Sequence, residues 1–309
     1  MDAGHRYHRP VMLGECIEAL QIRPEGIYVD ATFGGGGHSL KILEHLKGGR
    51  LVAFDQDEDA KLQSENIASR SFTFCQANFR YVKQYLKLNG ITQVDGVLAD
   101  LGISSHQIDS PERGFSTRFD GPLDMRMNKK SSLTAARVLN EYSASELHKI
   151  FGMYGEVKNA KTLAERVTQQ RAAKKLDTSA DLIGLLTPMA PRGREFKYFA
   201  QVFQALRIEV NQEMQALEEF LMQCAEIIGV GGRLVVMSYH SLEDRMVKNY
   251  IATGKVYGAL EKDFYGNPIK PFQAVNRKPI EASEQEIEEN NRARSAKLRI
   301  AERIKSDGK

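Results

Sequence analysis

The chain has 309 residues, 42% of them hydrophobic, which is enough for two domains or for one domain with a large insertion. No apolar stretch reaches the roughly 18 residues of a membrane span, and the N-terminus lacks the pattern of a secretory signal. Three widely spaced cysteines, Cys16, Cys75 and Cys224, argue against a disulfide framework or a zinc site. We therefore expect a soluble cytoplasmic protein with neither a metal nor a membrane partner.

Positive charge is concentrated in the middle of the chain. Seventeen Lys/Arg and nine Asp/Glu lie between Arg113 and Arg207, whereas the whole chain has a net charge of only +3. The stretch from Arg292 onward is also basic. Concentrated positive charge is typical of nucleic-acid-binding surfaces, although a solvated basic surface gives the same counts.

Short β-rich runs alternate with helical patterns over the first hundred residues. The β-rich runs are 27–31, 50–55, 72–76 and 95–100. The helical segments between them are 39–47, 57–69 and 80–89. This alternation predicts βαβ units and a parallel sheet. Ligands of such sheets bind beyond the carboxyl ends of the strands, so we expect Asp30, Asp55 and Asp100 to converge on one crevice.

The next strand is predicted only at 231–241, after a helical pattern over 211–228. The gap before it is too long for one crossover and contains the helical segments 133–151, 156–175 and 178–187. We therefore predict an α/β core formed by 1–105 and 211–309, with a helical domain inserted at 106–210.

The remainder of the chain is predicted to complete the core. We expect a helix at 242–252 and strands near 274–280 and 296–301. The charged run "EASEQEIEENNRARSAK" (281–297) is interpreted as a solvated connection.

Four consecutive glycines stand between the first strand and the first helical segment, in "DATFGGGGHS" (30–39). A P-loop is excluded because no Gly-Lys-Ser/Thr follows, and the dinucleotide fingerprint Gly-x-Gly-x-x-Gly also fails. Asp55 lies eighteen residues after Gly37, where an acid of this fold binds ribose hydroxyls. Asp30, just before the glycines, suits a cationic ligand better than a pyrophosphate.

These features fit S-adenosylmethionine, which has a ribose and two cationic groups but no phosphate. Backbone amides at the helix N-terminus would receive its carboxylate, Asp55 its ribose, and Phe79 its adenine, while Asp100 would lie near the charged groups. Each residue also has a structural alternative, because a strand-end Asp is often a cap and a lone Phe is often part of a core.

The sequence further resembles the bacterial ribosomal RNA small subunit methyltransferase H family. The matching motifs are "HRPVML" (8–13), "YVDATFGGGGHS" (28–39), "AFDQD" (53–57), "DGVLADLGISSHQID" (95–109), "ERGFSTRFDGPLDMRM" (112–127), "FQALRIEVNQE" (203–213), "GGRLVVMSYHSLEDR" (231–245) and "NRARSAKLRIAER" (291–303). The resemblance implies a class I, Rossmann-like S-adenosylmethionine-dependent methyltransferase core with an inserted all-helical domain. It also implies methylation of N4 of a cytosine in the decoding region of 16S rRNA within the 30S subunit.

The resemblance implies the cofactor contacts as well. They are Gly36, Gly37, His38, Asp55, Phe79, Asp100 and Gln107. The chain departs from the family at three places: Ala200-Gln201 stand in a region where Thr-Arg is common, Asn291 replaces a Pro, and Tyr239 replaces a Phe. Asn291 and Tyr239 are expected to touch no cofactor contact.

Methyl transfer to a cytosine amine requires alignment of the amine with the methyl carbon and acceptors for its N–H groups. The Asn/Asp-Pro-Pro-aromatic motif of many amino methyltransferases is missing after the fourth strand. We hypothesise that Asp100, with Ser104 and Ser105, receives the amine. His240 is the candidate to position the base or to relay a proton, with a structural loop role as an equal alternative.

The target base must leave its stack, which favours an exposed loop of structured RNA held through its phosphates. The candidate phosphate contacts are Arg113, Arg118, Arg126, Lys129, Lys130, Arg192 and Arg194 in the insertion, and Arg292, Arg294 and Arg299 after it. Arg126 has an equal alternative, which is pairing with Asp124 or Asp120.

Three other classes stay open at this point. They are a DNA cytosine-N4 methyltransferase, an NAD-linked or nucleotide-binding enzyme, and a non-enzymatic ribosome-assembly protein that retains a cofactor pocket. The sequence does not distinguish a monomer from a homodimer.

Overall fold

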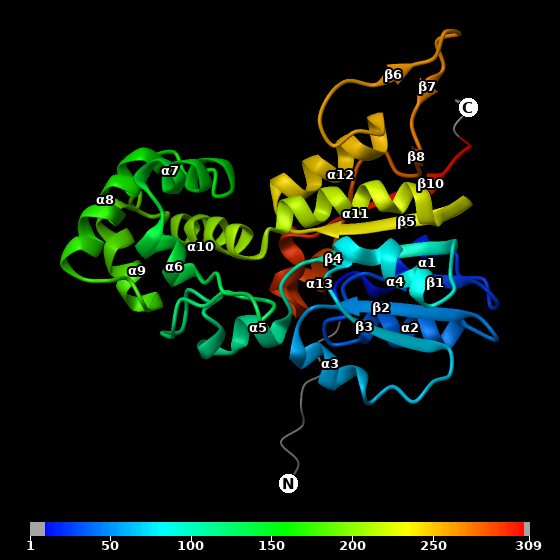
Figure 1. The fold of residues 1–309 in the computed structure, drawn as a ribbon, viewed down its shortest axis with the longest axis horizontal. Coiled ribbons are helices and arrows are strands. Elements are labelled where there is room, and N and C mark those ends of the chain that lie inside the picture. Colours follow the sequence, from blue (N-terminus) through cyan, green and yellow to red (C-terminus); the bar gives the residue numbers. More distant parts are fainter. Residues whose placement is uncertain (1–9, 306–309) are drawn as a thin grey trace. The chain divides into compact units, whose positions relative to one another are not determined.

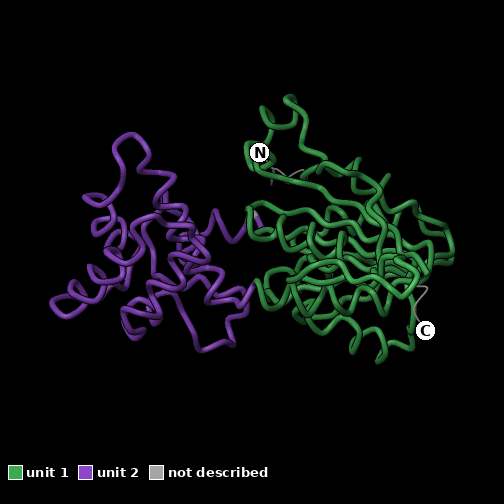
Figure 2. Tube along the Cα trace, turned by 90° about the horizontal axis from the view of Figure 1, so that it is seen from above, with its two compact units in different colours: residues 1–102, 214–309 green, residues 103–213 purple. Residues whose placement is uncertain are grey.

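The computed structural model describes residues 10–305, which form two compact units (Figures 1 and 2). Unit 1 comprises the described residues up to Gly102 and from Met214 onward, and unit 2 comprises Ile103–Glu213. The predicted insertion, 106–210, falls within the range of unit 2. Within 10–305, none of the helices has the length and apolar character needed to cross a bilayer.

Unit 1 is built on a sheet with the strand order β3-β2-β1-β4-β5-β10-β8, in which β9 also pairs with β10. The strands are β1 (Ile27–Asp30), β2 (Arg50–Asp55), β3 (Phe72–Gln76), β4 (Val94–Leu101), β5 (Ile228–Ser238), β8 (Phe272–Ala274), β9 (Ile280–Glu281) and β10 (Lys297–Arg303). The first five strands pair in parallel, and β10 is antiparallel to β5. Because the order reverses between β1 and β4, the ends of these two strands define the topological switch point of the sheet.

Helices cover both faces of this sheet, which explains why the middle residues of its central strands are apolar (Figure 1). On one face pack α4 (Val82–Leu88), α11 (Glu213–Ile227) and α12 (Ser241–Thr253); on the other pack α1 (Leu13–Leu20) and α2 (Gly37–His45). In β2, Leu51 packs toward the second face and Val52 and Phe54 toward the first, and all three are fully buried. Unit 1 also contains α3 (Glu58–Ser64), α13 (Glu284–Glu289) and a separate hairpin of β6 (Glu261–Lys262) and β7 (Pro268–Ile269).

Unit 2 is helical and has a core of its own. Its helices are α5 (Ser105–Asp109), α6 (Ala135–Glu141), α7 (Ala144–Met153), α8 (Ala160–Ala173), α9 (Ser179–Leu186) and α10 (Glu195–Asn211). Fully buried Leu139, Phe151, Leu163, Leu182 and Val202 come from five of these helices and belong to one cluster. The chain leaves unit 2 at Gln212, which has a left-handed backbone (φ 51°) and separates α10 from α11.

The elements predicted in the first hundred residues are confirmed, but two later segments differ. The predicted helix 133–151 is two helices, because the Ser143 side chain caps α7 and forms a capping box with Glu146. The predicted strand 274–280 is wrong, since β8 ends at Ala274 and β9 begins at Ile280. Between them the Asn276 side chain takes the place of a strand, accepting from Ile300 N and donating to Leu298 O.

The interpretation of 281–297 as a solvated connection is also wrong. This stretch contains α13 and a 3-10 turn (Asn291–Ser295), and Ala293 and Ala296 are buried against the core that contains α1. The side chain of Glu286 accepts from the backbone N of Met12 (2.7 Å), so the segment is fixed to the start of α1.

Candidate functional site

Three aspartates lie at the carboxyl ends of neighbouring strands of unit 1, as the sequence predicted. Asp30 ends β1, Asp55 ends β2 and Asp100 is the penultimate residue of β4. Burial is the main reason why the pKa of each of them is raised. The charge of Asp30 raises the pKa of both Asp55 and Asp100 further, so the three carboxyls share one electrostatic environment.

Asp30 is buried and holds the glycine turn. Its Oδ2 accepts from the Ser39 hydroxyl (2.6 Å) and its Oδ1 from the backbone N of Thr32 (3.1 Å). These bonds and the nearby His38 lower the pKa of Asp30 against the larger effect of burial. Asp30 therefore joins the end of β1 to the first turn of α2.

The glycine run is required by backbone conformation and by close approaches within the protein. Gly34 and Gly36 have left-handed backbones (φ 53° and 80°), which glycine adopts without strain. A Cβ on Gly36 would lie 2.7 Å from the Phe33 ring, and one on Gly37 would collide with the ring of Pro10. Among the described residues no side chain caps α2, so the amides that open the helix stay available to an anion.

Asp55 links the second strand to the glycine turn. Its Oδ2 accepts from the backbone N of Gly34 (2.8 Å) and its Oδ1 from that of Asp57 (2.9 Å). Burial raises the pKa of Asp55 to about 6 despite these two bonds. At neutral pH the carboxylate is ionised and keeps lone pairs for further donors, such as a pair of hydroxyls.

Asp100 has a buried carboxylate oxygen that the protein does not satisfy. Its Oδ1 has no hydrogen-bond partner in residues 10–305, whereas its backbone N donates to Thr32 Oγ1 (2.7 Å). Burial raises the pKa of Asp100, and His38 and a hydrogen bond from Tyr239 lower it. A buried acceptor without a donor is costly, which marks Asp100 as a group awaiting a ligand.

The expectation that Tyr239 touches no cofactor contact is therefore wrong. Its hydroxyl faces Asp100 and lowers the pKa of that carboxyl, and its ring lies against Gly102, where an added Cβ would stand 3.0 Å from Cε2. The pairing of Leu101 with Ser238 brings the two strand ends together and places Tyr239 beside Asp100. A phenylalanine at this position would fill the same space without the hydroxyl.

His240 is the N-cap of α12 and is held in place by Glu243. The imidazole Nδ1 accepts from the backbone N of Glu243 (3.4 Å), and Nε2 lies 3.1 Å from Glu243 Oε1. Both side chains are nearly buried. His240 thus has the structural role that we expected as the alternative, and its use in the reaction stays a prediction.

Phe79 and Gln107, two further cofactor candidates, also have structural contacts. The partly buried Phe79 ring meets Phe220 edge to face, with 5.1 Å between centroids. In unit 2, Gln107 and Ser104 form the capping box of α5, each accepting from the other's backbone N (3.0 and 3.2 Å). The side chain of Ser105 lies outside the described residues.

The basic residues of unit 2 divide into internal and exposed ones. Arg113 is only 3% exposed and donates to the carbonyl of Arg126 (3.0 Å), so its assignment as a phosphate contact is wrong. Arg126 pairs with Asp124 through two hydrogen bonds (2.7 and 2.8 Å), which is the alternative to phosphate binding that we predicted for it. The exposed ones are Arg118, Lys129, Lys130, Arg192 and Arg194.

In unit 1, the basic residues after 290 also divide. Arg294 is exposed and Arg292 is partly buried. Arg299 is buried and pairs with Asp244 (2.6 Å from Nε), so it is part of the framework and not a phosphate contact.

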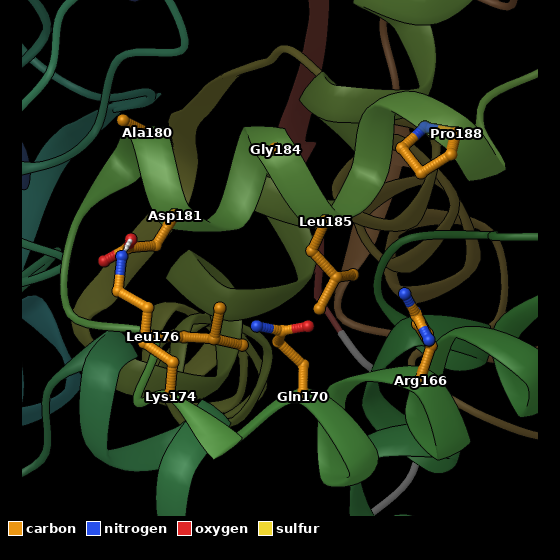
Figure 3. Close-up of a pocket in the computed structure, with 9 residues that line it drawn as sticks. All are labelled: Arg166, Gln170, Lys174, Leu176, Ala180, Asp181, Gly184, Leu185 and Pro188. Carbon is orange, nitrogen blue, oxygen red and sulfur yellow. Dashed lines mark hydrogen bonds and ion pairs between the residues drawn. The ribbon is translucent and has the colours of Figure 1, made fainter. Parts of the chain in front are cut away.

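A depression of about 330 Å³ lies between α8 and α9 of unit 2 (Figure 3). Figure 3 shows Arg166, Gln170 and Lys174 along one side of it, with Lys174 paired to Asp181 (2.6 Å). None of the predicted catalytic or cofactor residues lines it. Arg166 and Lys174 nevertheless add to the positive side chains of this unit, and the sequence did not single them out.

Sequence reasoning missed Thr32 and Ser39, which position Asp100 and Asp30. Both residues lie inside the segment 30–39, close to Asp30 at the end of the first strand. Hydroxyl side chains at such positions could have indicated that they bind the strand-end acids. In the sequence, Tyr239 differs from other positions only as a departure from the family, and nothing there indicates that it lies beside Asp100.

A parallel α/β sheet with three acids at the carboxyl ends of neighbouring strands and a glycine turn opening the helix after the first strand defines a class I methyltransferase core. The chain belongs to the MraW methylase family, which matches residues 5–304. It is 59% identical over 297 residues to the ribosomal RNA small subunit methyltransferase H of Cytophaga hutchinsonii, covering 96% of this chain and 99% of the relative. The protein of the same name from Bacteroides fragilis is 54% identical over 298 residues, covering 96% and 97%. The predicted family and enzyme class are thus confirmed.

Proposed function

We propose that this chain transfers a methyl group from S-adenosylmethionine to N4 of a cytosine in the decoding region of 16S rRNA on the small ribosomal subunit. The observation that carries the proposal is the buried, unsatisfied Oδ1 of Asp100, at the end of the sheet where Asp30 and Asp55 also lie. The names of the relatives, which describe methyltransferases of small-subunit rRNA, support the choice of substrate.

The residues present fit S-adenosylmethionine. Within 10–305 no Lys or Arg pairs with Asp30, Asp55 or Asp100, so a cationic ligand would compensate charge that the protein leaves unbalanced. Asp55 would accept from the ribose hydroxyls, and the uncapped amides of Gly37 and His38 would receive the carboxylate. Gly36, whose own amide donates to Phe33 O (2.8 Å), would let the cofactor approach the backbone closely. Phe79 and Gln107 complete the proposed set.

When bound, the cofactor supplies a methyl group on a cationic sulfur that leaves as a neutral thioether. Asp100 would accept from an N–H of the cytosine amine, which fixes the direction of its lone pair and stabilises the positive charge that develops on nitrogen. Ser104 and Ser105 would offer further acceptors. His240, held by Glu243, would position the base or take the proton that the amine loses.

The exposed cations of unit 2, together with Arg292 and Arg294, are proposed to hold the RNA through its phosphates. This makes affinity for the substrate depend strongly on salt. Arg113 and Arg126 are excluded from the set because their guanidinium groups bond within the protein.

The test is transfer of labelled methyl to 30S particles from a strain lacking this enzyme, followed by nucleoside analysis. We expect the label in N4-methylcytidine of 16S rRNA. Label in another nucleoside would overturn the assigned position, and label in DNA would favour the DNA cytosine-N4 alternative. Tight binding of the particle and cofactor without transfer would indicate an assembly protein.

A further inference from the structure

The β6–β7 hairpin of unit 1 presents two neighbouring aromatic side chains at its tip. Phe264 is 98% exposed and Tyr265 is 85% exposed, more than any other large hydrophobic residue that the structure describes. Their ring centroids are 5.6 Å apart and the ring planes are nearly perpendicular (87°). Figure 1 shows the hairpin, in orange, extending beyond α12. Aromatic rings normally contribute large buried areas, so a fully exposed pair indicates a binding surface.

The tip that carries these rings is fixed by hydrogen bonds. Asp263 Oδ1 accepts from the backbone N of Tyr265 (2.9 Å) and of Asn267 (2.8 Å), and Oδ2 accepts from Asn267 Nδ2 (3.0 Å). The turn closes with Gly266, whose left-handed backbone (φ 86°) allows its N to donate to Asp263 O (3.1 Å). The two rings are therefore presented on a preorganised turn, which lowers the entropy lost on binding.

The charge around the tip is positive. Residues 255–278 contain five Lys/Arg and two Asp/Glu. Both acids are engaged, Glu261 with Lys255 and Asp263 within the turn. Lys262 and Lys270, which flank the turn, form no ion pair with any other residue in 10–305. Uncompensated cations beside exposed aromatic rings are the combination with which proteins bind single-stranded nucleic acid.

We propose that this hairpin is an RNA-contacting element, in which Phe264 and Tyr265 stack on unpaired bases of the rRNA substrate and Lys262 and Lys270 contact adjacent phosphates. The inference rests on the proposed function, because that function supplies the RNA. Stacking accepts any base, so the element contributes affinity and placement of the substrate, not choice of the methylated nucleotide.

The first experiment compares the double variant Phe264→Ala/Tyr265→Ala with wild type in methyl transfer to 30S particles. We expect KM for the particle to rise at least about tenfold. The cofactor Kd and kcat at saturating particle should stay unchanged. Leu62→Ala and Leu88→Ala serve as matched controls, because both residues are exposed apolar side chains of unit 1 (60% and 73%) away from the hairpin.

A double variant with the wild-type KM would overturn the inference while leaving the proposed function intact. If wild-type protein does not methylate the particle at all, the proposed function fails instead. RNA binding by the hairpin is then measured directly by fluorescence.

The second experiment uses Tyr265→Trp, which creates the sole tryptophan of the chain. Because indole also stacks, this variant should keep the wild-type KM, and protein-free 16S rRNA should quench its emission in a salt-dependent manner. Quenching by intact 30S particles but not by protein-free rRNA would overturn the inference in favour of a ribosomal protein partner. A change in tryptophan emission that depends on protein concentration alone would overturn the inference in favour of a second copy of the chain.

Discussion

The buried guanidinium groups of unit 2 and the Asp100 carboxylate of unit 1 differ in whether the protein satisfies them. In unit 2 the buried or half-buried guanidinium groups of Arg113, Arg126 and Arg207 are all satisfied by carbonyls or carboxylates of the same unit. In unit 1 the buried Arg299 is likewise paired, with Asp244, but Oδ1 of Asp100 has no partner among residues 10–305, and the charge of Asp30 acts on the same carboxyl. Satisfied buried charge serves the fold, whereas unsatisfied buried charge is retained for a ligand.

The sharpest test of this contrast is Asp100→Asn. We expect kcat at saturating cofactor to fall by about 10²–10³, since an acceptor for developing positive charge is lost. The melting temperature should stay equal or rise, because the change removes a buried charge that the protein does not compensate.

The matched control is Asp95→Asn on the same strand. Asp95 pairs with Arg23 and accepts from Ile27 N (2.7 Å) at the far end of β4, so this change should cost stability and spare kcat. Wild-type turnover of Asp100→Asn with an intact fold would remove Asp100 from the chemistry.

Asp55→Asn tests the second acid through pH. Burial raises the pKa of Asp55 to about 6 from 3.8, so the folded state binds the proton more tightly than the unfolded state. The resulting contribution to the free energy of unfolding is fully present below pH 4 and is lost as pH rises through 6. The difference between these pKa values corresponds to about 3 kcal/mol. The melting temperature of the asparagine variant relative to wild type should therefore rise as pH increases through 6. Below pH 4 the variant should be less stable by the one acceptor it lacks, because its amide nitrogen cannot accept from Gly34 N or Asp57 N.

Cofactor affinity should change in the other direction. Ribose hydroxyls bond best to the ionised carboxylate, so wild-type affinity should fall below pH 6, whereas the variant should bind about tenfold more weakly without this dependence. Cofactor affinity is measured by calorimetry at each pH. The control variant is Glu58→Gln, which removes the charge of an exposed acid of α3. An unchanged affinity profile in Asp55→Asn would contradict its role as the ribose acceptor.

The contrast within unit 2 is tested by Arg113→Ala against Arg192→Ala/Arg194→Ala. Loss of the buried Arg113 should cost about 1–3 kcal/mol of unfolding free energy, because the carbonyl of Arg126 loses its donor. The exposed pair should leave stability unchanged and reduce the slope of log affinity against log salt by about 1.5. Reversed results, with stability lost in the exposed pair and salt dependence lost in Arg113→Ala, would refute the division.

Tyr239→Phe should have the smallest effect. The hydroxyl lowers the pKa of Asp100, so its removal raises that pKa and shifts the acid limb of the kcat profile toward higher pH. Turnover well above this limb should change only a few-fold, and cofactor affinity little. Phenylalanine preserves the packing of the ring, so a purely structural role would leave the pH profile unmoved. A shift of the whole acid limb along the pH axis would therefore show that the hydroxyl acts on Asp100. An unmoved acid limb would show that the hydroxyl does not act on Asp100.

The parallel half of the sheet was predictable because its strands are short apolar runs, three of which end at or next to an aspartate. The C-terminal elements were not, since β8 and β9 are short and Asn276 substitutes for ladder bonds with its side chain. Charge counts also did not distinguish Arg113 from Arg192, because burial depends on tertiary packing. Among the site residues, strand-end position identified Asp55 and Asp100, but Tyr239 required the pairing of β4 with β5.

The position of β10 in the sheet sets an order of events during synthesis. Unit 2 is one continuous stretch and has all of its core residues once Glu213 has been made. Unit 1 must wait for β10, which separates β5 from β8 and contributes the buried Leu298 and Ala301. The inserted unit therefore has the opportunity to fold on the translating ribosome while the catalytic sheet still lacks the strand that joins β5 to β8, and a stop codon before residue 297 would leave the methyltransferase core open.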